Sequence, residues 1–307
     1  MKAMRIGECI YCRTKQGPFG DEHLIARGLN GPWVLNEASC KERCEKITSA
    51  FEGHVLGPVL RGARAGLKMR MGDRPTTLPL LIDRGDGDFV EVQVPIEDYP
   101  AVVQFPEYLP PAYLDTRPYT SGIDLCGERT IQVAGPRPED VGRRLGAKGM
   151  RWTTEFKRTT FPRLIAKVAY TFLVADVGLD SIETSYVVPA ILEEADDIGR
   201  WVGCDEMHYI TDLRYLHGVM QKIVNDEVFM RVRLFACYGA PEYVVVVGRL
   251  RPGAVAGKFK VSGPEGISRT RTHAEVEANA QPAPAPFMPK NHTVAVERIP
   301  GKRSRSR

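Results

Sequence analysis

The sequence has no apolar run long enough to cross a membrane and no strong excess of charge of one sign. A spanning helix requires roughly 18 apolar residues or more, and residues 1–8 do not form a charged-then-apolar leader. We therefore expect a cytoplasmic protein with no membrane partner. The net charge of +4 is mildly basic, which agrees with a nucleic-acid partner without requiring one. With 307 residues, the chain can form one large domain or two modest ones, and its oligomeric state stays open.

Cysteine is scarce, but four of the seven cysteines form two close pairs near the N-terminus. These pairs are Cys9-x2-Cys12 and Cys40-x3-Cys44. Two such pairs can supply the four thiolates of a tetrahedral Zn2+ site. Two disulfides or four free core cysteines are the alternatives, and a reducing compartment disfavours the disulfides. We therefore predict a structural zinc ion on these four cysteines. The remaining cysteines are scattered, and we expect core positions or no role for them: Cys126, Cys204 and Cys237.

The residues around the two pairs resemble the HNH endonuclease family. The similar segments, in order, are CIYC, DEHLIARGLNG, VLNEASC and CEKITSAFE. They are most similar to the bacterial branch of that family whose core ends in an Ala-Ser-Cys…Ile-Thr-Ser…Phe-Glu run. The resemblance implies a zinc-stapled ββα-metal domain over residues 1–60, and the predicted helix from Cys44 to about Leu60 agrees with it.

The resemblance also implies roles for individual residues. His23 matches the general base that activates water, and Asn36 matches the middle Asn that orients this histidine. Glu22 and Glu45 match the ligands of one catalytic Mg2+ or Mn2+ ion. The implied reaction is hydrolysis of phosphodiester bonds in DNA, and RNA stays open as a substrate. A neutral imidazole with a pKa of about 6.5 suits such a base, and oxygen ligands suit such an ion.

Several features keep other interpretations open. Ala26 stands where the family usually has Pro, Glu45 stands in place of His or Asn, and the second cysteine pair is one residue wider. These departures favour a non-catalytic, zinc-stapled module that binds nucleic acid or protein, whereas the Glu22-His23 pair favours an enzyme. Farther along the predicted helix, Glu52 and His54 are alternative ligands.

A basic segment follows the predicted helix. Arg61, Arg64, Lys68 and Arg70 are the predicted nucleic-acid contacts, and an ordinary solvated surface is the alternative.

The chain as a whole is predicted to be of the α+β class, with residues 61–251 forming an accessory domain of unknown role. Its expected elements are strands within 77–105 joined by a turn at 84–87, a strand pair around Gly127, a helix within 160–181 that Gly178 ends, a helix over 187–203, and a hairpin over 227–250. We expect His208 and His217 to be core or surface histidines, because their spacing matches no metal motif.

Residues 252–307 are rich in Pro and Ala and end in a basic run. Residues 290–307 carry six basic residues and one acidic residue, a net charge of +5 that exceeds the +4 of the whole chain. We predict a disordered tail, which either adds salt-sensitive affinity for nucleic acid or serves only solubility.

Overall fold

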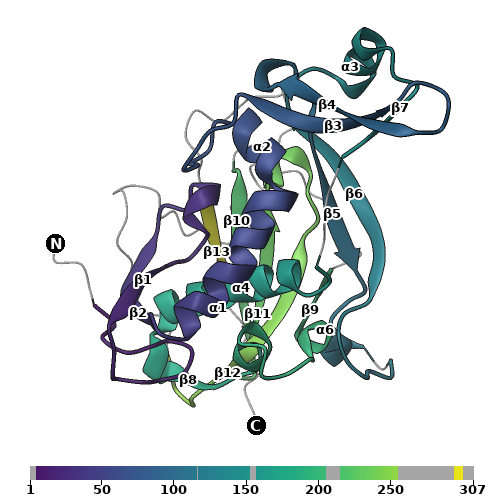
Figure 1. Ribbon diagram of the computed structural model, residues 1–307. Helices are drawn as coiled ribbons and strands as arrows, with labels where there is room; N and C mark the ends of the chain where they lie inside the picture. Colours follow the sequence, from purple (N-terminus) through teal and green to yellow (C-terminus); the bar gives the residue numbers. More distant parts are fainter. Residues whose placement is uncertain (1–4, 116, 153–156, 205–214, 255–293, 300–307) are drawn as a thin grey trace.

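The computed structural model describes residues 5–115, 117–152, 157–204, 215–254 and 294–299. Within these residues the predicted α+β class is confirmed, since strands in four sheets combine with helices of very different length (Figure 1). Among the described residues, no helix combines the length and apolar character needed to cross a bilayer.

The N-terminal segment folds as two antiparallel strands followed by a helix. Strands β1 (Phe19–His23) and β2 (Val34–Cys40) pair, and helix α1 (Cys44–His54) begins four residues after β2 ends. Helix α1 buries Cys44, Thr48 and Phe51, which share one face because they are four and three residues apart. The predicted helix to about Leu60 is confirmed, although its end widens into a π-helical turn (Val55–Val59) around Pro58 before α2 (Arg61–Gly66).

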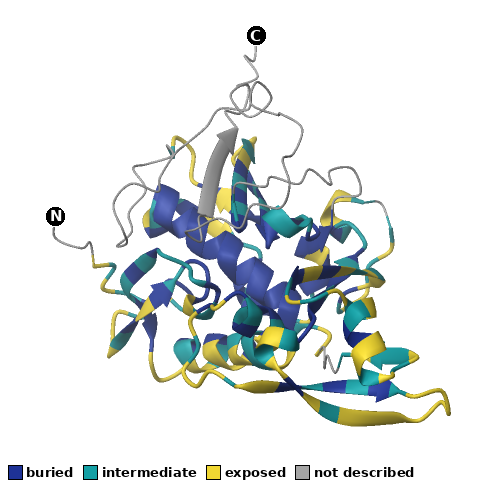
Figure 2. Ribbon diagram, turned by 90° about the horizontal axis from the view of Figure 1, so that it is seen from above, coloured by how far each residue is buried: buried dark blue, intermediate teal, exposed yellow. Residues whose placement is uncertain are grey.

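Helix α4 (Thr160–Val177) runs through the centre of the molecule and is buried along its whole length (Figure 2). It packs against α1 on one side and against strands of the largest sheet on the other. As predicted, the helix ends at Gly178, whose φ of 81° favours glycine. The burial of Arg163 and Lys167 on this helix requires polar partners inside the protein.

The largest sheet has the strand order β13-β10-β11-β12-β8, and β9 also pairs with β12. Its strands are β8 (Ile182–Ser185), β9 (Val202–Cys204), β10 (His217–Val224), β11 (Glu227–Leu234), β12 (Tyr243–Leu250) and β13 (Val294–Ile299). The predicted hairpin over 227–250 is confirmed as β11 and β12. Strand β10 was not predicted; it joins β11 through Asn225 and Asp226, both with positive φ, as in a tight hairpin turn.

A second group of strands extends away from the centre (Figure 1). It comprises β3 (Thr77–Asp83), β4 (Phe89–Pro95), β5 (Ala101–Tyr108), β6 (Leu125–Ala134) and β7 (Gly149–Arg151), with α3 (Pro138–Leu145) beside them. The β3–β4 hairpin confirms the predicted turn at 84–87, where the Asp83 carboxylate accepts hydrogen bonds from the N–H groups of Gly85 and Gly87. Short 3-10 turns complete the fold: Arg27–Leu29, Ile96–Asp98, Ala112–Leu114, Leu179–Ser181 and Ala236–Tyr238.

Three predictions about secondary structure were wrong. The helix over 187–203 is two single turns, α5 (Val188–Ile191) and α6 (Ile198–Trp201), because the chain takes a left-handed conformation at Glu193, with φ 61°. The strand pair around Gly127 is one strand, β6, which pairs with the distant β5. The tail is not wholly without structure, since β13 pairs in parallel with β10; its other residues from 255 onward lie outside the described part.

One hydrophobic core extends from Cys9 to Leu250. The N-terminal segment and the helix α4 therefore share buried surface. The division into domains of residues 1–60, 61–251 and 252–307 stays a prediction.

Candidate metal centre

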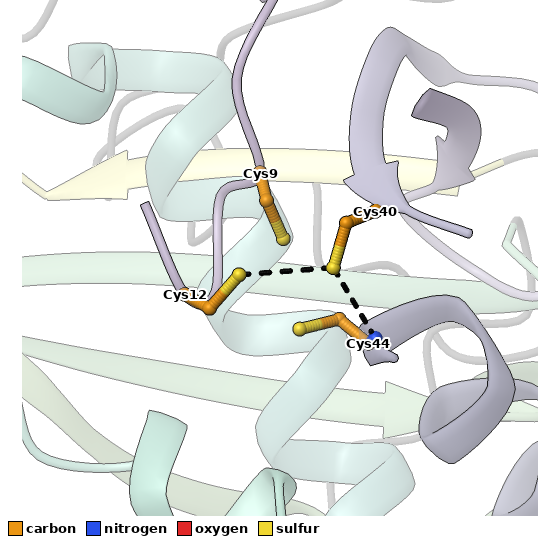
Figure 3. Close-up of side chains that lie close together, drawn as sticks. All are labelled: Cys9, Cys12, Cys40 and Cys44. Carbon is orange, nitrogen blue, oxygen red and sulfur yellow. Dashed lines mark hydrogen bonds between the residues drawn. The ribbon is translucent and has the colours of Figure 1, made fainter. Parts of the chain in front are cut away.

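The four paired cysteines converge on one point (Figure 3). Their sulfur atoms all lie within 4.8 Å of one another, and the Sγ atoms of Cys12 and Cys40 are 3.7 Å apart. Four sulfurs at a Zn–S bond length of about 2.3 Å would be separated by roughly 3.8 Å in a tetrahedron. The spacing and the all-sulfur donor set therefore fit a structural metal such as zinc.

Local backbone geometry positions these thiols. Cys9 and Cys12 lie in a tight turn that ends at Arg13, which has a φ of 60° and whose N–H donates to the Cys9 carbonyl (2.9 Å). Cys40 ends β2 and Cys44 begins α1, so the second pair spans the strand-to-helix corner. The Cys44 N–H donates to the Cys40 Sγ (3.4 Å), a hydrogen bond that stabilises a thiolate.

Three of these thiols have shifted pKa values, and the directions differ. A hydrogen bond from Cys44 lowers the pKa of Cys9 to about 4, although burial opposes this shift. The hydrogen bond to Cys9 and burial together raise the pKa of Cys44, and burial raises the pKa of Cys12. Four thiolates this close repel one another, so complete deprotonation requires a bound cation. None of the described cysteines forms a disulfide, so the disulfide alternative does not hold in this structure.

Glu22, ten residues after Cys12 in the sequence, belongs to a second group of polar side chains. Its side chain is buried on β1, and Glu22 Oε1 is 2.5 Å from Lys167 Nζ on α4. The same ammonium is 2.5 Å from Glu52 Oε1 on α1, and it donates to the backbone oxygen of His23 (2.9 Å). Burial raises the pKa of Glu22, a shift that Lys167 opposes. Burial also acts to lower the pKa of Lys167, but Glu22 and Glu52 together outweigh burial and raise this pKa.

Glu45 faces β1 from the first turn of α1. A Cβ atom at Gly20 would lie 2.1 Å from Glu45 Oε2, so the carboxylate occupies the space that glycine leaves open. This oxygen is buried, and within the described residues it has no hydrogen-bond partner. The charge of Glu45 also raises the pKa of Glu22, which places the two carboxylates within electrostatic reach of each other.

The charges of this group do not balance. Glu22, Glu45 and Glu52 carry three negative charges when ionised, and Lys167 carries one positive charge, which leaves −2. Buried or partly buried charges are stable only when they are paired. We call these four residues the carboxylate cluster. Its carboxylate oxygens are donors of the kind that hard divalent cations bind.

His23 follows Glu22 at the end of β1 and is partly buried. Burial lowers the pKa of His23, and the positive charge of Lys167 lowers it further, so the neutral imidazole is favoured. The ring atom Nδ1 is enclosed and has no hydrogen-bond partner among the described residues. Asn36 lies on β2, one residue past the partner of Glu22, and its backbone oxygen accepts a hydrogen bond from the Ile6 N–H (2.9 Å).

Glu22, His23 and Glu45 do not form a three-ligand cluster like that of the cysteines. In the described part of the chain, the one group of three or more histidine, cysteine or carboxylate side chains close enough together to hold a single metal ion is Cys9, Cys12, Cys40 and Cys44. The structure therefore places Glu22, His23 and Glu45 near one another, but their side chains do not converge on a single point.

The predicted nucleic-acid contacts separate into two kinds. Arg61, Lys68 and Arg70 are exposed. Arg64 is partly buried and donates to three backbone oxygens: those of Gly28 (2.9 Å), Leu56 (2.7 Å) and Arg70 (2.6 Å). These bonds tie the turn after β1 to the basic segment, so Arg64 organises the surface on which the other three cations lie.

The scattered histidines that the structure describes have structural environments. His217 is fully buried; its Nε2 is 3.0 Å from the Leu29 oxygen, and its Nδ1 accepts from the Phe235 N–H (3.2 Å). The expectation of a core histidine is therefore met at His217, whereas His208 lies outside the described residues. His54 Nε2 accepts a hydrogen bond from the Lys157 N–H (3.4 Å).

Comparisons of the chain with protein-family models, with curated proteins and with solved structures find no match. Sequence reasoning places Lys167 on the side of its helix opposite the apolar face, and this expectation was wrong, because the structure buries Lys167 among the acids of the carboxylate cluster. Its signal was available: Lys167 interrupts the long apolar run of the clearest predicted helix, between Ala166 and Val168. A lone cation at such a position indicates a buried ionic partner.

Proposed function

We propose that the chain is a metal-dependent endonuclease of the HNH type that hydrolyses phosphodiester bonds in DNA. The observation that supports this proposal is the carboxylate cluster, whose excess charge of −2 lies beside a neutral histidine. The four-cysteine site supports it as well, because a zinc ion there would hold the end of β2 against the start of α1. Glu45 lies in the first turn of α1, so the ion would fix its position.

The residues divide the chemistry between them. His23 accepts the proton of the attacking water, through Nε2 because Nδ1 is enclosed. Glu22 and Glu45 would hold Mg2+ or Mn2+ through carboxylate oxygens. The ion, when bound, supplies positive charge to the phosphate and to the leaving oxygen. Arg61, Lys68 and Arg70 position the backbone of the nucleic acid through its phosphates.

A nicking assay tests the enzymatic part of the proposal. Supercoiled plasmid is incubated with the zinc-loaded protein and Mn2+ or Mg2+, beside the His23→Ala variant. We expect nicking by the wild type and a loss of roughly 100-fold or more in the variant, since a general base contributes about that factor. Equal nicking by both proteins would show that the activity comes from a contaminant or another site.

Metal binding tests the carboxylate cluster separately. We expect Mn2+ to bind at one site per chain beyond zinc and to be lost in Glu45→Gln. The matched control is Asp21→Asn, because Asp21 adjoins Glu22 but is exposed and accepts a hydrogen bond from the Glu37 N–H (3.0 Å), which an amide oxygen can also accept. Equal loss in the control would refute the assignment of the ion to the cluster.

One observation favours a second function, a non-catalytic module that binds nucleic acid. Glu22 is only 5% exposed and already has Lys167 as a cationic partner. If the zinc-loaded protein binds DNA but neither nicks it nor binds Mn2+, this module is the function and the nuclease proposal fails.

A further inference from the structure

Lys167 on α4 is a fully buried cation whose hydrogen bonds all go to the N-terminal segment. Its side chain is 1% exposed, and its three ammonium hydrogens face three oxygens. These acceptors are Glu22 Oε1 (2.5 Å), Glu52 Oε1 (2.5 Å) and the backbone oxygen of His23 (2.9 Å). No hydrogen is left over, because a lysine ammonium has three donors.

We propose that Lys167 is a positioning residue of the candidate site, and that its ammonium fixes the Glu22 side chain and the His23 backbone together. The inference rests on the proposed function, because it assigns a task in that reaction. Lys167 cannot act on substrate itself, since it is enclosed on all sides. It acts through the two adjacent residues that the reaction requires.

The set of acceptors distinguishes this task from simple charge balance. Glu52 alone would neutralise the ammonium, and a purely structural ion pair between α4 and α1 would need nothing more. The other two hydrogen bonds both go to the Glu22-His23 dipeptide, one to the side chain of the first residue and one to the main chain of the second. These two bonds restrain both the carboxylate orientation and the strand that carries the imidazole.

The energetic scale of such positioning is large. A displacement of about 1 Å at a reacting group can lower a rate by roughly 100-fold. Without the ammonium, Glu22 loses its cationic partner and the His23 oxygen at the end of β1 loses its hydrogen bond from α4. Removal of the ammonium would also take away the one positive charge of the cluster, so the attraction for a divalent cation should not weaken.

This combination predicts a split between turnover and metal binding. In Lys167→Met we expect kcat for plasmid nicking to fall roughly 10- to 100-fold, while the affinity for Mn2+ is maintained or increased. The matched control is Arg163→Met, which removes a second buried cation from the same helix. Arg163 donates to the Ile191 oxygen (3.1 Å), pairs with Glu193 and lies over the Phe51 ring of α1 (4.6 Å), and in the described residues none of its hydrogen bonds goes to β1. We expect its nicking rate to stay within about threefold of the wild type.

Lys167→Arg guards against a failure of the Met variant to fold. It keeps the positive charge, so the buried carboxylates stay paired, but a planar guanidinium cannot present three hydrogens around one nitrogen. We expect it to fold, bind zinc and nick slowly. Wild-type turnover in Lys167→Arg, or equal losses in Lys167→Met and Arg163→Met, would overturn the positioning role.

Hydrogen exchange separates this inference from the proposed function. We expect the backbone amides of β1 to exchange at least about tenfold faster in Lys167→Met than in Arg163→Met, because the His23 oxygen at the end of β1 has lost its hydrogen bond from α4. Unchanged protection of β1 would refute the inference even if the protein is a nuclease. A wild type that neither nicks DNA nor binds Mn2+ would instead refute the proposed function, whatever the exchange result.

Discussion

Removal of one zinc-site thiol gives the most direct test of the N-terminal structure. Cys44 is fully buried, begins α1 and belongs to the group of four sulfurs within 4.8 Å of one another. In Cys44→Ser, a hydroxyl that stays protonated replaces a thiolate, so three sulfur ligands remain. We expect the variant to bind zinc much more weakly and to lose stability when a chelator is present.

The magnitude follows from the number of ligands. Structural four-ligand zinc sites have apparent binding free energies of roughly 10–16 kcal/mol at neutral pH. One ligand of four then corresponds to about 3 kcal/mol, which is roughly a 100-fold loss of affinity. For a chain of 307 residues with an unfolding entropy of about 2.1 cal/mol/K per residue, about 3 kcal/mol lowers Tm by roughly 5 °C.

Two measurements check this expectation. Metal analysis should find about one zinc per wild-type chain, and competition with a chromophoric chelator gives the change in affinity. The control is Cys204→Ser, since Cys204 is also buried, its sulfur accepts the Tyr108 N–H, and among the described residues it does not belong to the four-cysteine group. A wild-type protein that is folded but holds no zinc, or a Cys44→Ser variant with unchanged affinity, would refute the structural-zinc reasoning.

Three further predictions concern the carboxylate cluster and the basic segment. Gly20→Ala places a methyl group 2.1 Å from the position that Glu45 Oε2 occupies, so the carboxylate must turn away; Mn2+ binding should be lost while zinc content, measured by metal analysis, is unchanged. Lys68→Ala should lower the slope of log affinity for duplex DNA against log salt concentration by about one, as the loss of one phosphate contact does. Arg64→Ala should instead lower Tm, because three backbone oxygens lose their hydrogen-bond donor. Burial raises the folded-state pKa of Glu22, so ionised Glu22 lowers the stability of the fold at pH values above the unfolded-state pKa. Lys167→Met should raise the folded-state pKa of Glu22 further, because Lys167 opposes the effect of burial. In urea titrations, the stability lost by this variant should therefore be larger at pH 7.5 than at pH 5. An equal difference between the proteins at both pH values would contradict this last prediction.

Local patterns in the sequence predicted the elements that depend on neighbouring residues. The two cysteine pairs indicated the metal centre, and apolar spacing indicated the helices that begin at Cys44 and near Thr160. Gly178 ended the second helix as expected, because its positive φ is accessible to glycine. These features are short-range, so a single sequence contains the information that specifies them.

Interactions between distant segments could not be predicted in this way. The bond from Lys167 to the His23 oxygen joins residues 144 positions apart, and no periodicity in either segment indicates the other. The pairing of β6 with β5 was missed for the same reason, since the choice of partner is decided by the whole sheet and not by the strand's own residues. His23, the proposed general base, was named from its motif, whereas the lysine that donates to its backbone oxygen became apparent only from the fold.

Helix α4 connects both candidate sites through backbone oxygens of the N-terminal segment. Lys167 donates to the His23 oxygen, Thr171 to the Leu24 oxygen (3.2 Å), and Tyr170 to the oxygen of Ile10, which lies between Cys9 and Cys12. A fragment that ended near residue 60 would lose all three donors, and it would also expose the face of α1 that packs on α4. Such a fragment retains the four thiols but not Lys167, the one cation of the carboxylate cluster. The N-terminal segment and α4 therefore form one structural unit, and α4 belongs to the candidate site as much as β1, which carries Glu22 and His23, and α1, which carries Glu45 and Glu52.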